Sequence, residues 1–210
     1  MQTIKKLKRT KFTKIEKDTK TKYLFLKTNT TGLPRNWKAP ITDTDNWPRM
    51  VQLAWILSDN NGNTTESMEF IVKPENYEIP FDATMIHGVS TGRAMNDGVN
   101  LRSVLTIFNE RINEADYIVG HNVQFDMNVI GAELLRKNIP TELFNKKKIC
   151  TMRASTDYCQ LSGPLGFKYP KLAELYYLLF GYDVHLIHDA LVDLKVTEKC
   201  YWKLRRICVI

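Results

Sequence analysis

Short apolar runs separated by polar turns recur along the chain and predict strands. The turn sequence Asp-Asn-Asn-Gly-Asn at residues 59–63 favours a hairpin between the runs on either side of it. The runs are short and mostly apolar, as expected for buried strands. The strands that we predict cover residues 23–26, 50–57, 69–72, 117–120 and 148–150.

Apolar residues spaced three or four apart predict helices in the remaining segments. The clearest case has apolar residues at positions 101, 104, 105, 108 and 112. Gly181 follows another helical segment and is a typical C-cap residue. The helices that we predict cover residues 101–112, 125–137 and 172–180, and a last helix lies within the stretch 187–204. We also predict a short helix near Thr84 and a long loop at residues 32–48.

This order of elements predicts an α/β fold in a single domain, with a mixed central sheet flanked by helices. Ligands in such folds bind beyond the carboxyl ends of the strands. Three segments meet there: residues 27–32, residues 121–126 and the start of the last helix. We therefore expect the functional residues at this edge of the sheet.

The composition is that of an ordinary globular domain, with 43% hydrophobic and 25% charged residues in a chain of 210. No apolar run is long enough to cross a bilayer, and no hydrophobic segment follows the basic N-terminus. We therefore expect a cytoplasmic protein with no membrane partner. Its four cysteines lack CxxC spacing, which favours reduced thiols over a zinc site or disulfides.

The net charge of +7 is concentrated at the N-terminus. Residues 1–22 contain nine lysines and arginines, and only Glu16 and Asp18 oppose them. We predict a basic N-terminal arm at residues 1–22 and a folded domain at residues 23–210. Such an arm can follow a nucleic-acid backbone by displacing counterions. A solubilising tail, or a segment packed on the domain, fits the same residues.

The last helix brings a histidine and a carboxylate close together at its start. His188 precedes the helix and Asp193 lies in its first turns. An imidazole beside a carboxylate can activate a water molecule near a metal ion. Acidic residues are also common at helix starts because they interact favourably with the helix dipole. The same two interpretations apply to Asp126, near the start of the helix after residues 117–120.

Four short motifs follow one another along the domain. They read Phe-Leu-Lys-Thr-Asn-Thr-Thr-Gly-Leu-Pro at 25–34, Ile-His-Gly-Val-Ser at 86–90, His-Asn-x-x-Phe-Asp at 121–126 and His-x-Ala-x-x-Asp at 188–193. With these motifs in this order, the chain resembles the DEDDh 3′–5′ exonucleases, the group of polymerase proofreading subunits and ribonuclease T. The resemblance covers roughly residues 23–205 and implies a ribonuclease H-like fold.

The resemblance implies a role for each matching residue. His188 would be the general base that deprotonates the attacking water. Asp126 and Asp193 would bind a pair of Mg²⁺ or Mn²⁺ ions, which stabilise the attacking and leaving oxygens of a phosphodiester. The implied partners are the 3′ ends of single-stranded DNA or RNA. The residues that would shape the pocket for the 3′ end are Thr30, Thr31, Gly32, Leu33, His87, Asn122 and Phe125.

The first motif departs from the family pattern at both of its metal ligands. Lys27 and Asn29 stand where the family has Asp and Glu. A protonated amine has no lone pair for a metal, and an amide is a neutral, weaker ligand. With Asp126, Asp193 and Lys27 the site sums to −1, too little for two divalent cations, and the Lys27 ammonium can take a metal's place between the aspartates. We expect metal binding to be weak or absent and the chain to be inactive or nearly so, through either a natural or an engineered change.

Three functions remain in competition. One is a 3′–5′ exonuclease disabled at its first motif. Another is a non-catalytic module that captures 3′ ends or recruits a protein partner. A purely structural domain leaves the retained His188 and Asp193 unexplained. Trp37 and Trp47, in the loop at 32–48, fit either stacking on bases above the groove or packing in the core.

Overall fold

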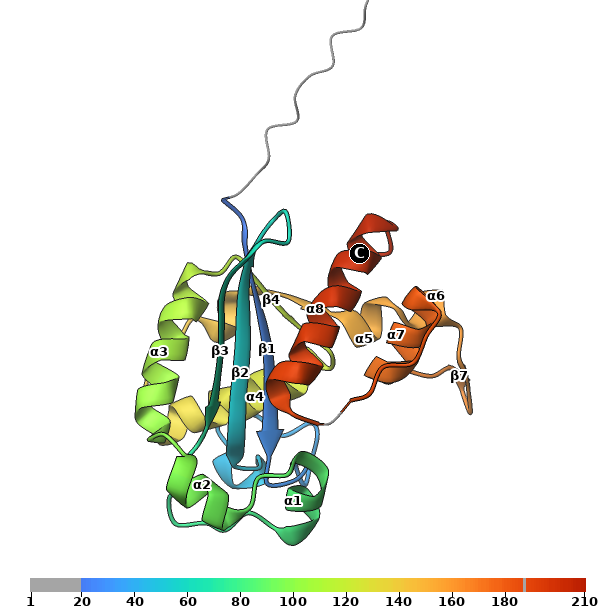
Figure 1. Ribbon diagram of the computed structural model, residues 1–210. Helices are drawn as coiled ribbons and strands as arrows, with labels where there is room; N and C mark the ends of the chain where they lie inside the picture. Colours follow the sequence, from blue (N-terminus) through green and yellow to red (C-terminus); the bar gives the residue numbers. More distant parts are fainter. Residues whose placement is uncertain (1–19, 187) are drawn as a thin grey trace, which may run out of the picture.

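The computed structural model describes residues 20–186 and 188–210 (Figure 1). A five-stranded sheet forms its centre, in the order β3–β2–β1–β4–β5. The strands are β1 (Lys22–Thr30), β2 (Met50–Asp59), β3 (Thr64–Ile71), β4 (Tyr117–Gly120) and β5 (Lys147–Cys150). The β1–β2 and β2–β3 pairs are antiparallel, whereas the β1–β4 and β4–β5 pairs are parallel. The predicted mixed α/β sheet is confirmed.

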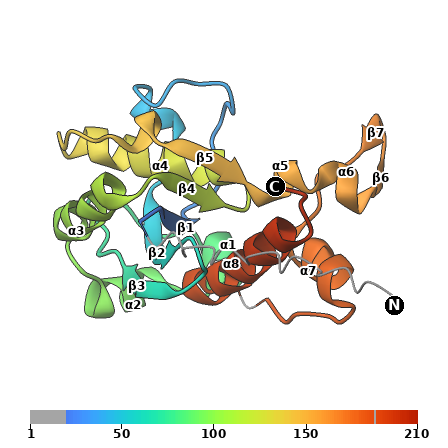
Figure 2. The same ribbon diagram turned by 90° about the horizontal axis from the view of Figure 1, so that it is seen from above.

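Three long helices cover the two faces of the sheet. They are α3 (Leu101–Glu114), α4 (Val123–Arg136) and α8 (Ala190–Arg206). Seen from above, α8 lies along one face and α3 and α4 lie along the other (Figure 2). Because both faces are covered, the strands are apolar on both sides, which explains the continuous apolar runs in the sequence.

Shorter elements complete the fold around this core. The short helices are α1 (Phe81–His87), α2 (Thr91–Asp97), α5 (Thr151–Ala154), α6 (Thr156–Cys159) and α7 (Leu172–Phe180). A small hairpin pairs β6 (Ser162–Gly163) with β7 (Gly166–Phe167), and 3₁₀ turns cover Thr44–Asn46 and Leu143–Asn145. In Figure 1, α1 and α2 lie below the sheet, near the end of β1.

Alternation along β1 decides which helix each of its side chains meets. Tyr23 and Phe25 pack in the cluster under α8, and Leu24 and Leu26 pack in the cluster with α3 and α4. Because successive side chains of a strand point to opposite faces of the sheet, Lys27 and Asn29 lie on the face covered by α8. Thr28 lies on the face covered by α4. One strand thus presents side chains to both helices that carry the predicted aspartates.

The sequence-based prediction was least accurate where apolarity is a poor guide. The strand predicted at 69–72 begins at Thr64, because the outer strand β3 is mostly exposed and its first half is polar. The hairpin β6–β7 and helices α2, α5 and α6 were not predicted. Residues 1–19 of the predicted arm at 1–22 lie outside the described residues. Lys22, the last residue of the predicted arm, belongs to β1. Within residues 20–186 and 188–210, no helix is long and apolar enough to cross a membrane.

Candidate functional site

A cavity of about 460 Å³ opens where β1 ends. Its floor is formed by the last residues of β1, and α1 and the start of α4 supply its walls. Of the seven residues predicted to hold a 3′ end, six line this cavity: Thr30, Thr31, Gly32, Leu33, His87 and Phe125. The seventh, Asn122, takes a left-handed conformation at the start of α4 and lies outside the lining.

Asp126 is anchored to the floor of the site by Thr28. The backbone N–H and the hydroxyl of Thr28 both donate to Oδ1 of Asp126, each over 2.8 Å. Burial raises the pKa of this carboxyl, while the charge of Lys27 and the two Thr28 hydrogen bonds act to lower it. One of the two Asp126 oxygens is therefore already bound to protein donors.

Asp193 lies in the first turn of α8 and, like Asp126 and His188, is not among the residues that line the cavity. Its Oδ2 is 3.9 Å from Nδ1 of His188, and its buried Oδ1 has no hydrogen-bond partner in the described part of the chain. Burial raises the pKa of Asp193, and the nearby charges of Lys27 and His188 oppose that rise. The predicted pairing of His188 with Asp193 is present, with one carboxylate oxygen left for a ligand.

His188 sits immediately before α8 in a left-handed backbone conformation, with φ of 55°. Its side chain is 58% exposed, so the imidazole faces solvent at the rim of the site. Asp189 caps the helix by accepting a hydrogen bond from the N–H of Val192 over 3.0 Å. The cap fixes where α8 begins and hence where His188 and Asp193 lie.

Asn29 ties the end of β1 to this rim. Its side-chain amide donates to the backbone carbonyl of His188 over 2.8 Å and to Oε1 of Gln52 over 2.7 Å. The Gln52 amide in turn donates to Glu69 over 2.7 Å. Burial raises the pKa of Glu69. Asn29 therefore occupies its position as a hydrogen-bond donor, a role that a glutamate cannot fill while ionised.

Gln52 and Glu69 were not identified from the sequence. Gln52 is the polar exception in a predicted strand that is otherwise mostly apolar, and it is buried in the structure. A buried polar side chain requires a hydrogen-bond partner. The isolated glutamine at position 52 was therefore the available signal for a polar network crossing the sheet.

Lys27 acts on both aspartates through its charge, without a direct bridge between them. Its ammonium donates to the backbone carbonyl of Thr28 over 3.3 Å. Its positive charge opposes the pKa increase that burial causes at Asp126 and at Asp193. Within the described residues, the contact observed for the ammonium is thus with the backbone of Thr28, and its effect on the two carboxylates is through its charge.

These residues do not fit a pair of divalent cations. Two carboxylates face the site, one oxygen of Asp126 is taken by Thr28, and Lys27 adds a positive charge beside them. Among residues 20–186 and 188–210, no group of three or more His, Cys, Asp or Glu side chains is arranged to hold a metal ion. Magnesium and manganese require several oxygen ligands with compensating negative charge, and this set falls short.

The cavity walls retain groups suited to a nucleotide. His87 accepts a hydrogen bond at Nδ1 from the N–H of Val89, which leaves Nε2 to carry the proton of the neutral ring. That Nε2 is buried and has no partner within the described residues, and burial lowers the pKa of the ring. Leu33 is 71% exposed beside it. A buried donor next to an exposed apolar side chain suits a ligand with polar and apolar parts.

The two tryptophans of the loop at 32–48 have different environments. Trp47 is 2% exposed and packs in the core with α3 and α4, so the interpretation as a base-stacking residue is wrong for it. Trp37 is 54% exposed, and its ring lies 5.7 Å from that of Phe125 in the cavity wall. Trp37 thus extends the aromatic surface of the cavity outward.

Comparison with known proteins found a family with a matching sequence model and solved structures with a similar fold. The sequence model of a family described as Exonuclease (RNase_T) matches residues 30–201. The search of curated proteins found no match.

Three solved structures illustrate the similarity of the fold. Escherichia coli exonuclease I in complex with a dA16 oligonucleotide is 19% identical, with a TM-score of 0.69 over 89% of this chain and 41% of that chain. The zinc-bound E. coli exonuclease I–ssDNA complex is 22% identical, with a TM-score of 0.69 over 90% and 41%. Exonuclease I from Methylocaldum szegediense is 20% identical, with a TM-score of 0.69 over 89% and 40%. This chain therefore spans about two-fifths of the length of these proteins.

Proposed function

The chain belongs to the exonuclease family whose sequence model matches residues 30–201, and from this premise we propose that it captures the 3′ ends of single-stranded nucleic acids with little or no hydrolysis. One observation carries the proposal. The cavity at the end of β1 keeps the residues suited to a terminal nucleotide, while Lys27 and Asn29 occupy the floor where acidic metal ligands are expected.

The cavity has the size and lining for one terminal nucleotide. Its volume of about 460 Å³ lies within the usual range for small-ligand sites. Leu33, Phe125 and Ile86 offer apolar surface to a base, and the unpartnered Nε2 of His87 offers a donor to an oxygen. E. coli exonuclease I, which shares this fold, is bound to single-stranded oligonucleotides in its solved complexes. These features support binding of a strand end.

The charge of the site favours holding a phosphodiester over cleaving it. Lys27 lowers the repulsion that Asp126 and Asp193 exert on a phosphate. His188 beside Asp193 can still act as a general base. General-base catalysis alone contributes about 10²–10⁴-fold, far below the 10⁶–10¹⁷-fold typical of enzymes. In the family, divalent metals supply the remaining charge stabilisation, and the residues present here do not fit two such ions.

The test compares this chain with the variant Lys27→Asp, Asn29→Glu. A 5′-labelled single-stranded oligonucleotide is incubated with each protein in Mg²⁺ and in Mn²⁺, and binding is measured separately by anisotropy. We expect the parent to bind the strand without shortening it, and the double variant to shorten it from the 3′ end. Lys38→Asp, an exposed lysine outside the cavity, is the control for a change of charge alone.

Each of the other possible results would contradict a different part of the proposal. Shortening by the parent would mean that Asp126, Asp193 and His188 suffice for hydrolysis. If neither protein binds a strand, the capture proposal is wrong. Equal binding of a strand with a free 3′ hydroxyl and a strand with a bulky 3′ block would show that the protein does not recognise the 3′ end. DNA and RNA strands of the same sequence are tested in parallel, because a 2′-hydroxyl is the feature that separates them.

A further inference from the structure

A second cavity lies at the opposite end of the sheet from the candidate site. It has a volume of about 530 Å³ and lies between the β2–β3 turn and the last turns of α8. Lys22, at the start of β1, pairs with Asp59 beside this turn, whereas Asn29 at the far end of β1 pairs with Gln52. The length of the sheet therefore separates the two cavities.

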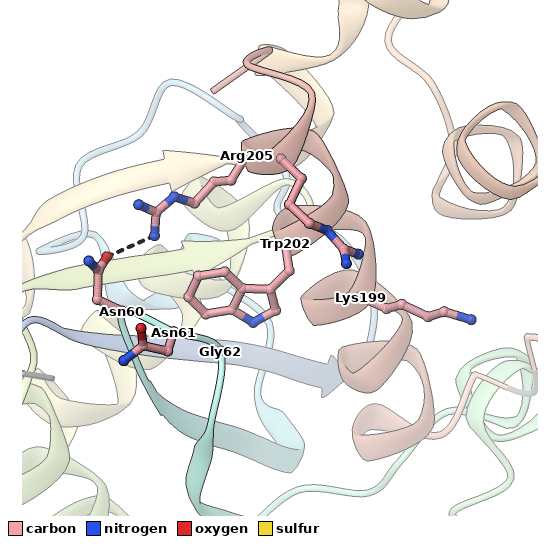
Figure 3. Close-up of a pocket in the computed structure, with 7 residues that line it drawn as sticks. Asn60, Asn61, Gly62, Lys199, Trp202 and Arg205 are labelled. Atoms are coloured by element: carbon pink, nitrogen blue, oxygen red, sulfur yellow. Dashed lines mark hydrogen bonds between the residues drawn. The ribbon is translucent and has the colours of Figure 1, made fainter. Parts of the chain in front are cut away.

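The lining of this cavity is basic. Three of its seven residues carry a positive charge, Lys199, Arg205 and Arg206, and none is acidic. The ammonium of Lys199 donates to the hydroxyls of Tyr176 and Tyr182 and points away from Trp202 (Figure 3). Two arginines therefore remain to supply charge to the cavity itself.

The nearest acidic residues are occupied by neutral donors. Glu198 accepts a hydrogen bond from the hydroxyl of Ser58 over 2.6 Å, and Asp59 accepts from the N–H groups of Asn61 and Asn63. In the part of the chain that the structure describes, neither Arg205 nor Arg206 forms an ion pair with a carboxylate. An arginine with no acidic partner is available to an anion.

Arg205 is held in position before any ligand arrives. Its Nη1 donates to Asn60 Oδ1 over 2.9 Å and to the hydroxyl of Tyr23 over 3.2 Å. Its guanidinium lies 5.4 Å from the ring centre of Trp202 (Figure 3). These contacts use one nitrogen of the guanidinium, so its remaining N–H groups can donate to an oxyanion.

Trp202 supplies a flat surface between the arginine and the turn. Gly62, with φ of +82°, lies so close that a Cβ there would be 3.3 Å from the indole ring. Figure 3 shows the indole between Arg205 and the turn that carries Asn61 and Gly62. The indole is therefore covered by the turn and by the guanidinium, and its Nε1 donates to Glu198 over 3.5 Å, so Trp202 serves as a support that helps to hold Arg205 in place.

We infer that this cavity is a second binding site for single-stranded nucleic acid, in which Arg205 and Arg206 contact phosphates. The lining supports this assignment, because two adjacent arginines without acidic partners in the described part of the chain match the closely spaced phosphates of a nucleic-acid backbone.

A circular single-stranded DNA tests the site without using a 3′ end. The full chain is titrated with the circle at several salt concentrations, alongside the variant Arg205→Gln, Arg206→Gln. We expect the double variant to bind the circle at least about tenfold more weakly. The slope of log affinity against log salt falls by about 1.4, because each phosphate contact with a single strand contributes about 0.7. A short 3′-ended oligonucleotide, which can also bind the cavity at the end of β1, should lose less affinity than the circle.

Matched variants separate the site from general charge and from misfolding. Lys203→Gln removes the same charge from the same helix but lies outside the lining. Within the residues that the structure describes, Arg206 forms no hydrogen bond or ion pair, so the thermal unfolding of Arg206→Gln matches that of the parent while the salt slope falls by about 0.7. Circle binding that the double variant leaves unchanged, or that Lys203→Gln weakens equally, overturns the inference.

Discussion

The side-chain amide of Asn29 donates a hydrogen bond to the backbone carbonyl of His188 over 2.8 Å, joining the end of β1 to the residue just before α8. The same amide donates to Gln52 Oε1. The side chain of residue 29 thus meets two acceptor oxygens. The amide at residue 29 matches this environment, and the left-handed backbone of His188 is held by it.

Replacing Asn29 by Asp should destabilise the fold by about 2–4 kcal/mol at neutral pH, because an ionised carboxylate meets two acceptors and both hydrogen bonds are lost. Protonation restores a donor, so the difference from the parent should shrink as the pH falls toward about 4. Urea unfolding at both pH values measures it. A difference that does not change with pH would contradict the assigned network.

Leu33→Ala should weaken binding of 3′-ended strands without changing stability. The side chain is 71% exposed, so its removal costs the fold little, while a base loses apolar contact worth about 1 kcal/mol or more. Fluorescence anisotropy with a labelled oligonucleotide measures the loss, about fivefold or more. Leu165→Ala, which changes a more exposed leucine in the β6–β7 turn outside the cavity, is the control and should bind as the parent does.

Glu133→Gln should destabilise the protein by about 3–5 kcal/mol, because removal of one partner leaves buried charges unpaired. Glu133 on α4 is fully buried, and its Oε1 accepts from Arg49 Nε over 2.8 Å and pairs with Arg136 over 3.0 Å. Arg49 is also hydrogen-bonded to Thr31 through the backbone, so the cavity rim should loosen and strand binding should weaken.

Glu110→Gln provides the comparison for that substitution. Glu110 is exposed and lies 3.6 Å from Arg111, so its loss should change the free energy of unfolding by less than about 1 kcal/mol. Chemical denaturation of both variants tests the pair. Similar values for Glu133→Gln and Glu110→Gln would show that the buried ion pair does not hold the rim.

Stability should decrease on acidification through His121. Burial lowers the pKa of this imidazole from 6.5 to about 4, and its two ring nitrogens are hydrogen-bonded to Thr151 and to the carbonyl of Pro170. Between these two pH values the unfolded chain binds more protons, so the free energy of unfolding falls as the pH drops, by about 3 kcal/mol in total, and His121 has no such effect above pH 6.5.

The variant His121→Gln isolates this contribution. It should remove the His121 part of the decline, so that its stability depends less on pH than that of the parent between pH 6.5 and 4. His185→Gln changes an exposed histidine and should follow the parent. Parallel pH dependence of all three proteins would show that His121 does not titrate as assigned.

The elements that were predicted correctly are those that interactions between residues close in the sequence determine. Tyr23, Phe25 and their neighbours lie in a buried strand because an apolar run can be stabilised only by burial on both faces, and α7 ends at Gly181, whose left-handed conformation an L-residue rarely adopts. The motif residues at 27–33, 87 and 125 come together because parallel strands end at the same edge of the sheet.

What the sequence did not predict depends on contacts between distant residues. Gln52 and His188 both accept from Asn29, across separations of 23 and 159 residues, and no periodicity reports such a pairing. Trp47 and Trp37 differ in burial because Trp47 lies beside α4, a helix more than 70 residues later in the chain. The basic cavity likewise requires the β2–β3 turn to meet the end of α8.

Helix α8, an element of 17 residues, runs from Asp193 of the candidate site to Arg205 of the basic cavity. Asp193 in its first turn and Arg205 in its last are separated by about 18 Å along the helix axis, at 1.5 Å per residue. A strand too short to cover this span can occupy one cavity or the other. Once a strand covers it, binding at one cavity raises the effective concentration of the strand at the other. Affinity should therefore increase in a step as the strand becomes longer. The length of α8 determines the strand length at which this step occurs.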